Sequence, residues 1–119
     1  RIMNISSGAG RKPYAGWGMY CSSKSGIDMI SQVAAVEQKD KDYPFQIASI
    51  APGVIDTGMQ NLIRTKTVDE FPPIARFHQL KEEGKLWSPN HAANLLVNYL
   101  ESPYFGEEPL FDIRSWEKK

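Results

Sequence analysis

The sequence has few of the features that mark secreted, membrane-spanning or nucleic-acid-binding proteins. Its single cysteine, Cys21, cannot form a disulfide within the chain, so we expect a reducing compartment such as the cytoplasm. No apolar stretch approaches the roughly 18 residues that a membrane-spanning helix needs. Fourteen basic residues balance fourteen acidic ones, which leaves no long-range field to attract nucleic acid or an anionic membrane. We therefore expect neither as a partner.

Two further absences limit what the chain can do alone. His78 and His91 lack the additional ligands that a metal site requires, so we expect no metal. The chain has no initiator methionine and opens at Arg1 on an apolar run typical of a buried strand. We therefore expect it to be part of a longer domain whose remaining residues precede Arg1.

What the sequence does contain is an alternation of strand and helix patterns. Strands are predicted at residues 1–6, 45–51 and 109–113, and helices at 20–38, 74–83 and from Ser88 and Pro89 onward. This alternation favours a parallel sheet covered by helices. Residues 58–87 form a long, aromatic-rich connection, which is typical of a lid or a binding loop.

Tyr20 and Lys24 lie four residues apart in the predicted helix 20–38, so the phenol and the ammonium share one helix face. A tyrosine hydroxyl exchanges protons poorly at neutral pH unless a nearby positive charge stabilises the phenolate. The pair is therefore suited to proton exchange with a substrate oxygen. Tyr-x-x-x-Lys alone also occurs as an ordinary pair on a helix surface.

Other residues support a catalytic role for Tyr20 and Lys24. Ser6 and Ser7 end the first predicted strand, and Pro52 and Gly53 end the second. In an open parallel sheet, ligands bind beyond the carboxyl ends of the strands. The serines and the Pro-Gly turn are therefore expected at the ligand-binding edge, where Gly53 permits close approach of the backbone.

The segments Asn4–Ser7, Tyr20–Lys24 and Ala51–Thr57, in this order and spacing, resemble the catalytic half of the short-chain dehydrogenase/reductase family. The resemblance runs from Arg1 to about Asp112. It implies an α/β fold, the C-terminal half of a doubly wound Rossmann-type parallel sheet in three α/β/α layers. The glycine-rich turn that seats the cofactor pyrophosphate in this family is not found, so the N-terminal half is expected outside the chain. Residues 1–119 are then the catalytic half of one domain, with residues 58–87 as its substrate lid.

The resemblance also implies roles for single residues. Tyr20 would be the general acid for carbonyl reduction, and Lys24 would support its phenolate and hold the nicotinamide ribose. Ser7 would hydrogen-bond the substrate carbonyl, with Ser6 as the competing candidate. The nicotinamide would be held by Tyr20, Lys24, Pro52, Gly53, Val54, Ile55 and Thr57.

Within the family, residues 16–29, 56–60 and 80–86 look like the benzil reductase and sepiapterin reductase branches. This implies NADPH as the cofactor, with NADH left open, and a small ketone or diketone as the substrate. Asp112 is the nearest match to an aspartate that anchors a pterin ring, or else a structural residue of the last strand. Trp17, Met59 and Phe77 are expected to line the substrate pocket, although core packing explains each equally well.

Several alternatives remain beside an NADPH-dependent carbonyl reductase similar to the benzil reductases. One is reduction of a pterin side-chain ketone. A nucleotide-sugar epimerase also uses Tyr-x-x-x-Lys but is disfavoured by the Pro-Gly segment and the short lid. A non-catalytic dinucleotide-binding fragment or scaffold is disfavoured by the intact Ser7, Tyr20 and Lys24. Apolar residues on more than one face of helix 20–38 indicate a homo-oligomer through that helix.

Overall fold

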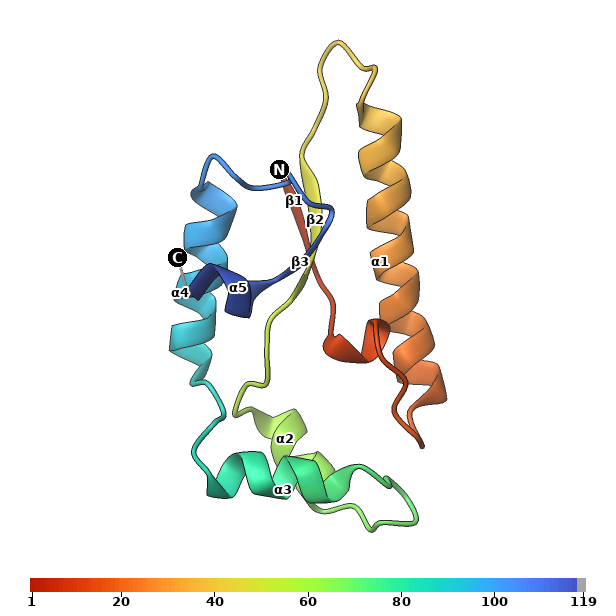
Figure 1. The fold of residues 1–119 in the computed structure, drawn as a ribbon, viewed down its shortest axis with the longest axis vertical. Coiled ribbons are helices and arrows are strands. Elements are labelled where there is room, and N and C mark those ends of the chain that lie inside the picture. Colours follow the sequence, from red (N-terminus) through yellow and green to blue (C-terminus); the bar gives the residue numbers. More distant parts are fainter. Residues whose placement is uncertain (118–119) are drawn as a thin grey trace.

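Figure 1 shows the computed structural model, which describes residues 1–117 as a small sheet between helices. Its elements in chain order are β1 (Ile2–Ile5), the 3₁₀ helix η1 (Gly8–Gly10), α1 (Gly18–Gln38), β2 (Ile47–Ala51), α2 (Gly58–Arg64), α3 (Ile74–Glu82), α4 (Pro89–Glu101), β3 (Leu110–Asp112) and α5 (Ile113–Glu117). Helix α1 lies on one side of the sheet and α4 on the other, while α2 and α3 lie together beyond one end of it (Figure 1). This arrangement confirms the predicted layered α/β fold.

The sheet has the order β1-β2-β3, and both pairs of strands are parallel. Ile2 of β1 is opposite Ile47 of β2, and Ser49 of β2 is opposite Leu110 of β3. The central strand β2 is buried at all five positions because helices cover both of its faces. A strand covered on both sides reads as a continuous apolar run rather than as an alternation, which is why the sequence predicts it well.

One face of β2 packs against α4. Ala48 and Ile50 form a buried cluster with Tyr99, Phe105 and Ile113. The Tyr99 ring also stacks on Phe111, with the centroids 4.4 Å apart. As predicted, α4 begins after Ser88, whose hydroxyl accepts a hydrogen bond from the backbone N–H of His91 at 3.2 Å.

The other face of β2 is joined to α1 by a buried polar network. Asp28 of α1 is only 4% exposed, and its carboxylate accepts hydrogen bonds from the Ser49 hydroxyl at 2.7 Å and from Arg11 Nε at 3.1 Å. Burial alone would raise the pKa of Asp28, but the hydrogen bonds from Arg11, Ser49 and Ser6 outweigh it and lower that pKa. This charged network, in which the Asp28 carboxylate has hydrogen-bond partners, fixes α1 on the sheet.

Two helices in the structure are not predicted from the sequence. Helix α2 starts with Gly58, after a Thr57-x-x-Gln60 pattern that has capping-box spacing, but Thr57 makes no side-chain capping hydrogen bond. Tertiary packing stabilises α2 instead, because Ile63 joins a buried cluster with Phe71 and Phe77. Helix α5 has only five residues, which is too short for a periodic pattern to be recognised.

Candidate active site

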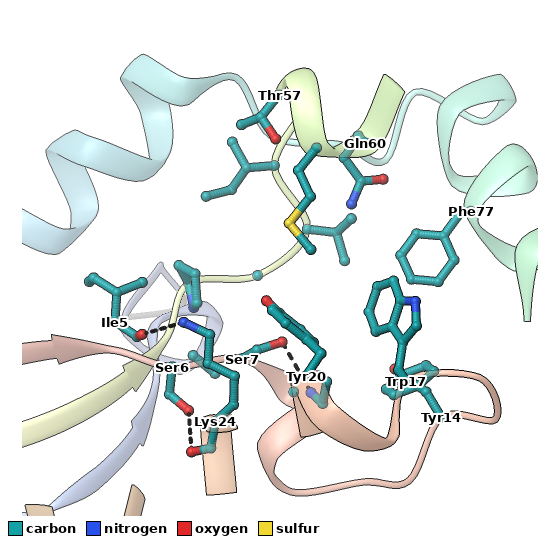
Figure 2. A pocket seen from close by; sticks show the side chains of 18 of the residues that line it. Ile5, Ser6, Ser7, Tyr14, Trp17, Tyr20, Lys24, Thr57, Gln60 and Phe77 are labelled. Carbon is teal, nitrogen blue, oxygen red and sulfur yellow. Dashed lines mark hydrogen bonds between the residues drawn. The ribbon is translucent and has the colours of Figure 1, made fainter. Parts of the chain in front are cut away.

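A cavity of about 250 Å³ lies beyond the carboxyl ends of β1 and β2, with α2 and α3 as its far wall (Figure 2). This is where an open parallel sheet binds its ligands. The structure brings nearly all the predicted site residues to it, namely Ser7, Trp17, Tyr20, Lys24, Pro52, Gly53, Val54, Ile55, Thr57, Met59 and Phe77. Residues that are up to 70 positions apart in the sequence therefore share one cavity.

Tyr20 and Lys24 lie on one face of the first turns of α1, as predicted. The Lys24 Nζ atom is 5.8 Å from the centroid of the Tyr20 ring. The same ammonium donates a hydrogen bond to the backbone carbonyl of Ile5 at the end of β1, at 3.0 Å (Figure 2). This hydrogen bond to the end of β1 holds the Lys24 ammonium beside the Tyr20 phenol. A carboxylate is not needed to position the charge.

The two serines after β1 point to different surroundings. The Ser7 hydroxyl accepts a hydrogen bond from the backbone N–H of Ala9 at 3.1 Å and begins η1. A hydroxyl that accepts one hydrogen bond still has its own proton to donate, so Ser7 can donate to an oxygen in the cavity. Ser6 is buried, and its hydroxyl donates to the backbone carbonyl of Lys24 at 3.5 Å. The geometry favours Ser7 over Ser6 as the group that meets a substrate.

Trp87 packs against the segment that follows β2. Gly53 has a φ of +81°, and a Cβ atom at this position would lie 3.3 Å from the Trp87 ring. Trp87 also exchanges backbone hydrogen bonds with the segment, donating to Val54 at 3.0 Å and accepting from Asp56 at 2.9 Å. A larger residue than glycine would be strained here, so Gly53 allows the backbone to form the cavity wall.

The lid is joined to the rest of the site by ion pairs of Asp56 with Lys81 and Arg64 and by aromatic packing. Lys81 of α3 contacts Asp56 at 2.7 Å, and this hydrogen bond lowers the pKa of the Asp56 carboxyl. The Phe71 ring stacks on Trp17 with the centroids 4.3 Å apart, and Trp17 meets Tyr20 edge-on at 5.0 Å. The lid therefore rests directly on the start of the helix that carries Tyr20.

The structure does not bring Asp112 to this cavity, in contrast to the predicted pocket role. Its carboxylate accepts hydrogen bonds from the backbone N–H of Arg114 at 3.0 Å and from Arg114 Nε at 2.9 Å. The side-chain hydrogen bond from Arg114 lowers the pKa of Asp112. The short turn from β3 into α5 places the guanidinium next to the carboxylate, so Asp112 is engaged locally.

Three long polar residues line the cavity without a predicted site role, namely Gln60, Arg76 and Arg114. Gln60 lies on the unpredicted helix α2, so its facing direction could not be inferred. Arg114 comes just after β3 at the carboxyl edge of the sheet, and that position was the available signal. Among the described lining residues there is no aspartate or glutamate, so Lys24 and the two arginines make the cavity basic.

Other classes of site have no counterpart in the part of the chain that the structure describes. Residues 1–117 contain no group of three or more histidine, cysteine, aspartate or glutamate side chains placed to hold a metal ion. No helix in the same range is both long and apolar enough to cross a membrane.

Comparisons with known proteins agree with the geometry. Residues 1–68 match the family model described as short chain dehydrogenase. The chain is 50% identical over 105 residues to a benzil reductase ((S)-benzoin forming) of Bacillus cereus, an alignment that covers 88% of this chain and 42% of that protein. It is 38% identical to the sepiapterin reductase of Meriones unguiculatus over 87% of this chain and 38% of the relative.

A solved structure shows the same fold. The crystal structure of the KRED1-Pglu enzyme superposes with a TM-score of 0.77 at 29% identity, over 92% of this chain and 45% of that one. The chain thus spans about two fifths of the length of the curated relatives it matches.

Proposed function

Because the chain belongs to the short-chain dehydrogenase family, we propose that it forms the catalytic part of an NADPH-dependent carbonyl reductase. The observation that carries this proposal is the convergence of Ser7, Tyr20 and Lys24 on one cavity at the carboxyl edge of a parallel sheet. The similarity to benzil reductases supports a diketone or a related aryl ketone as the substrate. Aromatic walls from Trp17 and Phe77 suit such a compound.

The residues present fit a nicotinamide cofactor by the chemistry of their donor groups. The Lys24 ammonium and the Thr57 hydroxyl lie on the same cavity as the open backbone of Pro52–Ile55, and together they offer donors for ribose hydroxyls and a carboxamide. The absence of aspartate and glutamate from the described lining suits an anionic dinucleotide. When bound, the cofactor supplies the hydride. We propose NADPH from the family resemblance alone, and kcat/KM measured with each dinucleotide distinguishes it from NADH.

The chain's own residues would handle the proton and the negative charge. The Tyr20 hydroxyl donates its proton to the substrate oxygen as the carbonyl is reduced. The Ser7 hydroxyl, whose own proton is free, donates a hydrogen bond to the charge that develops on that oxygen. The Lys24 ammonium, 5.8 Å from the tyrosine ring, stabilises the phenolate that remains.

The test uses the complete protein with NADPH and benzil. Tyr20→Phe removes the proton donor while keeping the ring that packs against Trp17, so we expect kcat to fall by about 10²–10⁴-fold. Dinucleotide affinity, measured by fluorescence titration, should change little. Retained turnover in Tyr20→Phe would refute the proposal, and absence of both binding and turnover in the wild type would favour a non-catalytic scaffold.

A pterin ketone is the second candidate substrate, supported by the similarity to sepiapterin reductases. The engagement of Asp112 with Arg114 leaves no free carboxylate there to anchor a pterin ring. We therefore rank this substrate below the diketone. A higher kcat/KM for sepiapterin than for benzil would reverse this ranking.

We also propose that the complete protein is a homo-oligomer of the cytoplasm that pairs through α1. The exposed apolar residues Met29, Ile30, Val33 and Val36 are 48–67% exposed on this helix, and exposed apolar patches commonly mark interaction surfaces. Sedimentation of the wild type as a monomer, or of Ile30→Lys as an unchanged oligomer, would contradict this assignment.

A further inference from the structure

Gln60 is a buried polar side chain that lacks a hydrogen-bond partner in the described part of the chain. It is 7% exposed, and its Oε1 atom is fully buried without a partner among residues 1–117. Buried polar groups in proteins are nearly always hydrogen-bonded, and leaving one unpaired is destabilising. Gln60 also lines the candidate active site, so a ligand in the cavity can pair with the part of the amide that faces the cavity.

The position of Gln60 is opposite the reacting groups. Figure 2 shows its side chain descending from α2 toward the cavity, across from Tyr20 and Ser7 and above the Trp17 and Phe77 rings. The surroundings on this wall are otherwise largely apolar. A polar group in such a place binds an oxygen or nitrogen of a ligand strongly, because few competing partners are near.

The orientation of the amide decides which of its atoms can meet a ligand. The Oε1 atom is buried and has no partner in the described range. Figure 2 shows the amide nitrogen of Gln60 turned toward the cavity. An amide nitrogen is a hydrogen-bond donor, so Gln60 presents a donor to a ligand in the cavity.

We propose that the Gln60 side-chain amide donates a hydrogen bond to the second carbonyl oxygen of a vicinal dicarbonyl substrate. Tyr20 and Ser7 hold the oxygen of the carbonyl group whose carbon accepts the hydride, and Gln60 on the opposite wall recognises the oxygen of the carbonyl group that does not react. A ketone without a second oxygen leaves the amide unpaired, so the site discriminates against it. This inference rests on the proposed carbonyl reductase function and names the group that selects its substrate class.

The test compares two aryl ketones with the complete protein and NADPH. 1-Phenyl-1,2-propanedione has the second oxygen, and 2,2,2-trifluoroacetophenone is an activated aryl ketone that lacks it. We expect Gln60→Leu to lower kcat/KM for the dione at least tenfold and to change that for the trifluoroketone less than threefold. Gln60→Glu keeps the size and shape of the side chain but removes the donor, so it should cause the same selective loss.

A matched control variant and three possible outcomes test the role of Gln60 in substrate selection. Gln79→Leu changes an exposed glutamine of α3 that is bonded to Glu83 and does not line the cavity, and it should alter neither substrate. Equal losses for both ketones in the Gln60 variants, or no loss for the dione, would overturn the role of Gln60 while leaving the carbonyl reductase intact. Failure of the wild type to reduce either ketone would instead contradict the proposed function. Thermal unfolding of both Gln60 variants shows that the comparison is made on folded protein.

Discussion

The two walls of the cavity are built in different ways. On the wall formed by α1 and β2, the Asp28 carboxylate is buried with hydrogen bonds from Arg11 and Ser49. On the lid wall, the corresponding charged contact is the pair of Asp56 and Lys81, whose side chains are 37% and 50% exposed. A buried, fully partnered network fixes geometry, whereas an exposed ion pair contributes little and is weakened by salt.

This difference separates two kinds of residue. Ser7, Tyr20 and Lys24, which would perform the chemistry, come from the rigid wall, while Met59, Gln60 and Phe77 come from the lid. Changes in the rigid wall should therefore affect stability at its buried network and turnover at its reacting groups. Changes in the lid should affect the choice and binding of substrate and leave the fold nearly intact.

The largest effect is expected from removing the buried carboxylate. Asp28→Ala leaves Arg11 and Ser49 without their acceptor, and breaking a buried charged pair on one side costs about 3–5 kcal/mol. Denaturant unfolding of the complete protein measures the free energy of unfolding. Asp40→Ala, an exposed aspartate after the end of α1, is the control and should change it little. Similar values for both variants would mean that the network does not fix α1.

Ser7→Ala tests the rigid wall for chemistry rather than stability. Removing one donor to a developing oxyanion lowers kcat by about 10²–10³-fold, while the lost cap of η1 should cost only about 1 kcal/mol. Ser22→Ala, at an exposed hydroxyl that bonds the Gly18 carbonyl within α1, is the matched control. Steady-state kinetics with benzil measure kcat for both variants. Normal activity in Ser7→Ala would mean that this serine acts only as the cap of η1.

Acid should weaken the rigid wall through Asp28. The folded-state pKa of this carboxyl lies below its ordinary value of 3.8, so its contribution to stability is complete above about pH 4 and is lost as the pH falls further. The free energy of unfolding should therefore drop more steeply toward low pH in the wild type than in Asp28→Asn. Parallel curves for the two proteins would contradict this assignment.

The smallest effect is expected at the lid. Lys81→Met removes the contact with Asp56, and an exposed ion pair contributes little to stability. We expect KM for the diketone to rise about two- to fivefold with little change in melting temperature. The difference from the wild type should shrink at 1 M salt, because salt screens the pair. Lys85→Met, which pairs only locally with Glu83, should leave KM unchanged.

Much of the framework is predictable from local patterns. The buried strand 47–51, helix α1 and the capped helix α4 all have strong sequence signals, and the structure has them within a few residues of the predicted bounds. The Tyr20 and Lys24 pairing follows from helix spacing alone. These features depend on residues that are close in sequence.

Two features are harder to predict. Helix α2 has only seven residues and is stabilised by packing of Ile63 rather than by a side-chain cap, so its inward face has no clear periodic pattern. Asp112 does not line the cavity, and Arg114, two residues later, donates to its carboxylate. The first depends on a tertiary contact, and the second on the direction in which the short turn after β3 places the Arg114 side chain.

Arg11 contacts groups that are widely separated along the chain. Its guanidinium bonds Asp28, the Ser49 carbonyl and the Phe111 carbonyl, which are 17, 38 and 100 positions away. Contacts between distant positions form slowly during folding because long loops must close first. The bond to the Phe111 carbonyl can thus form only once the C-terminal strand has docked, so the loop that follows Ser7 should reach its complete set of contacts after the helices have already formed.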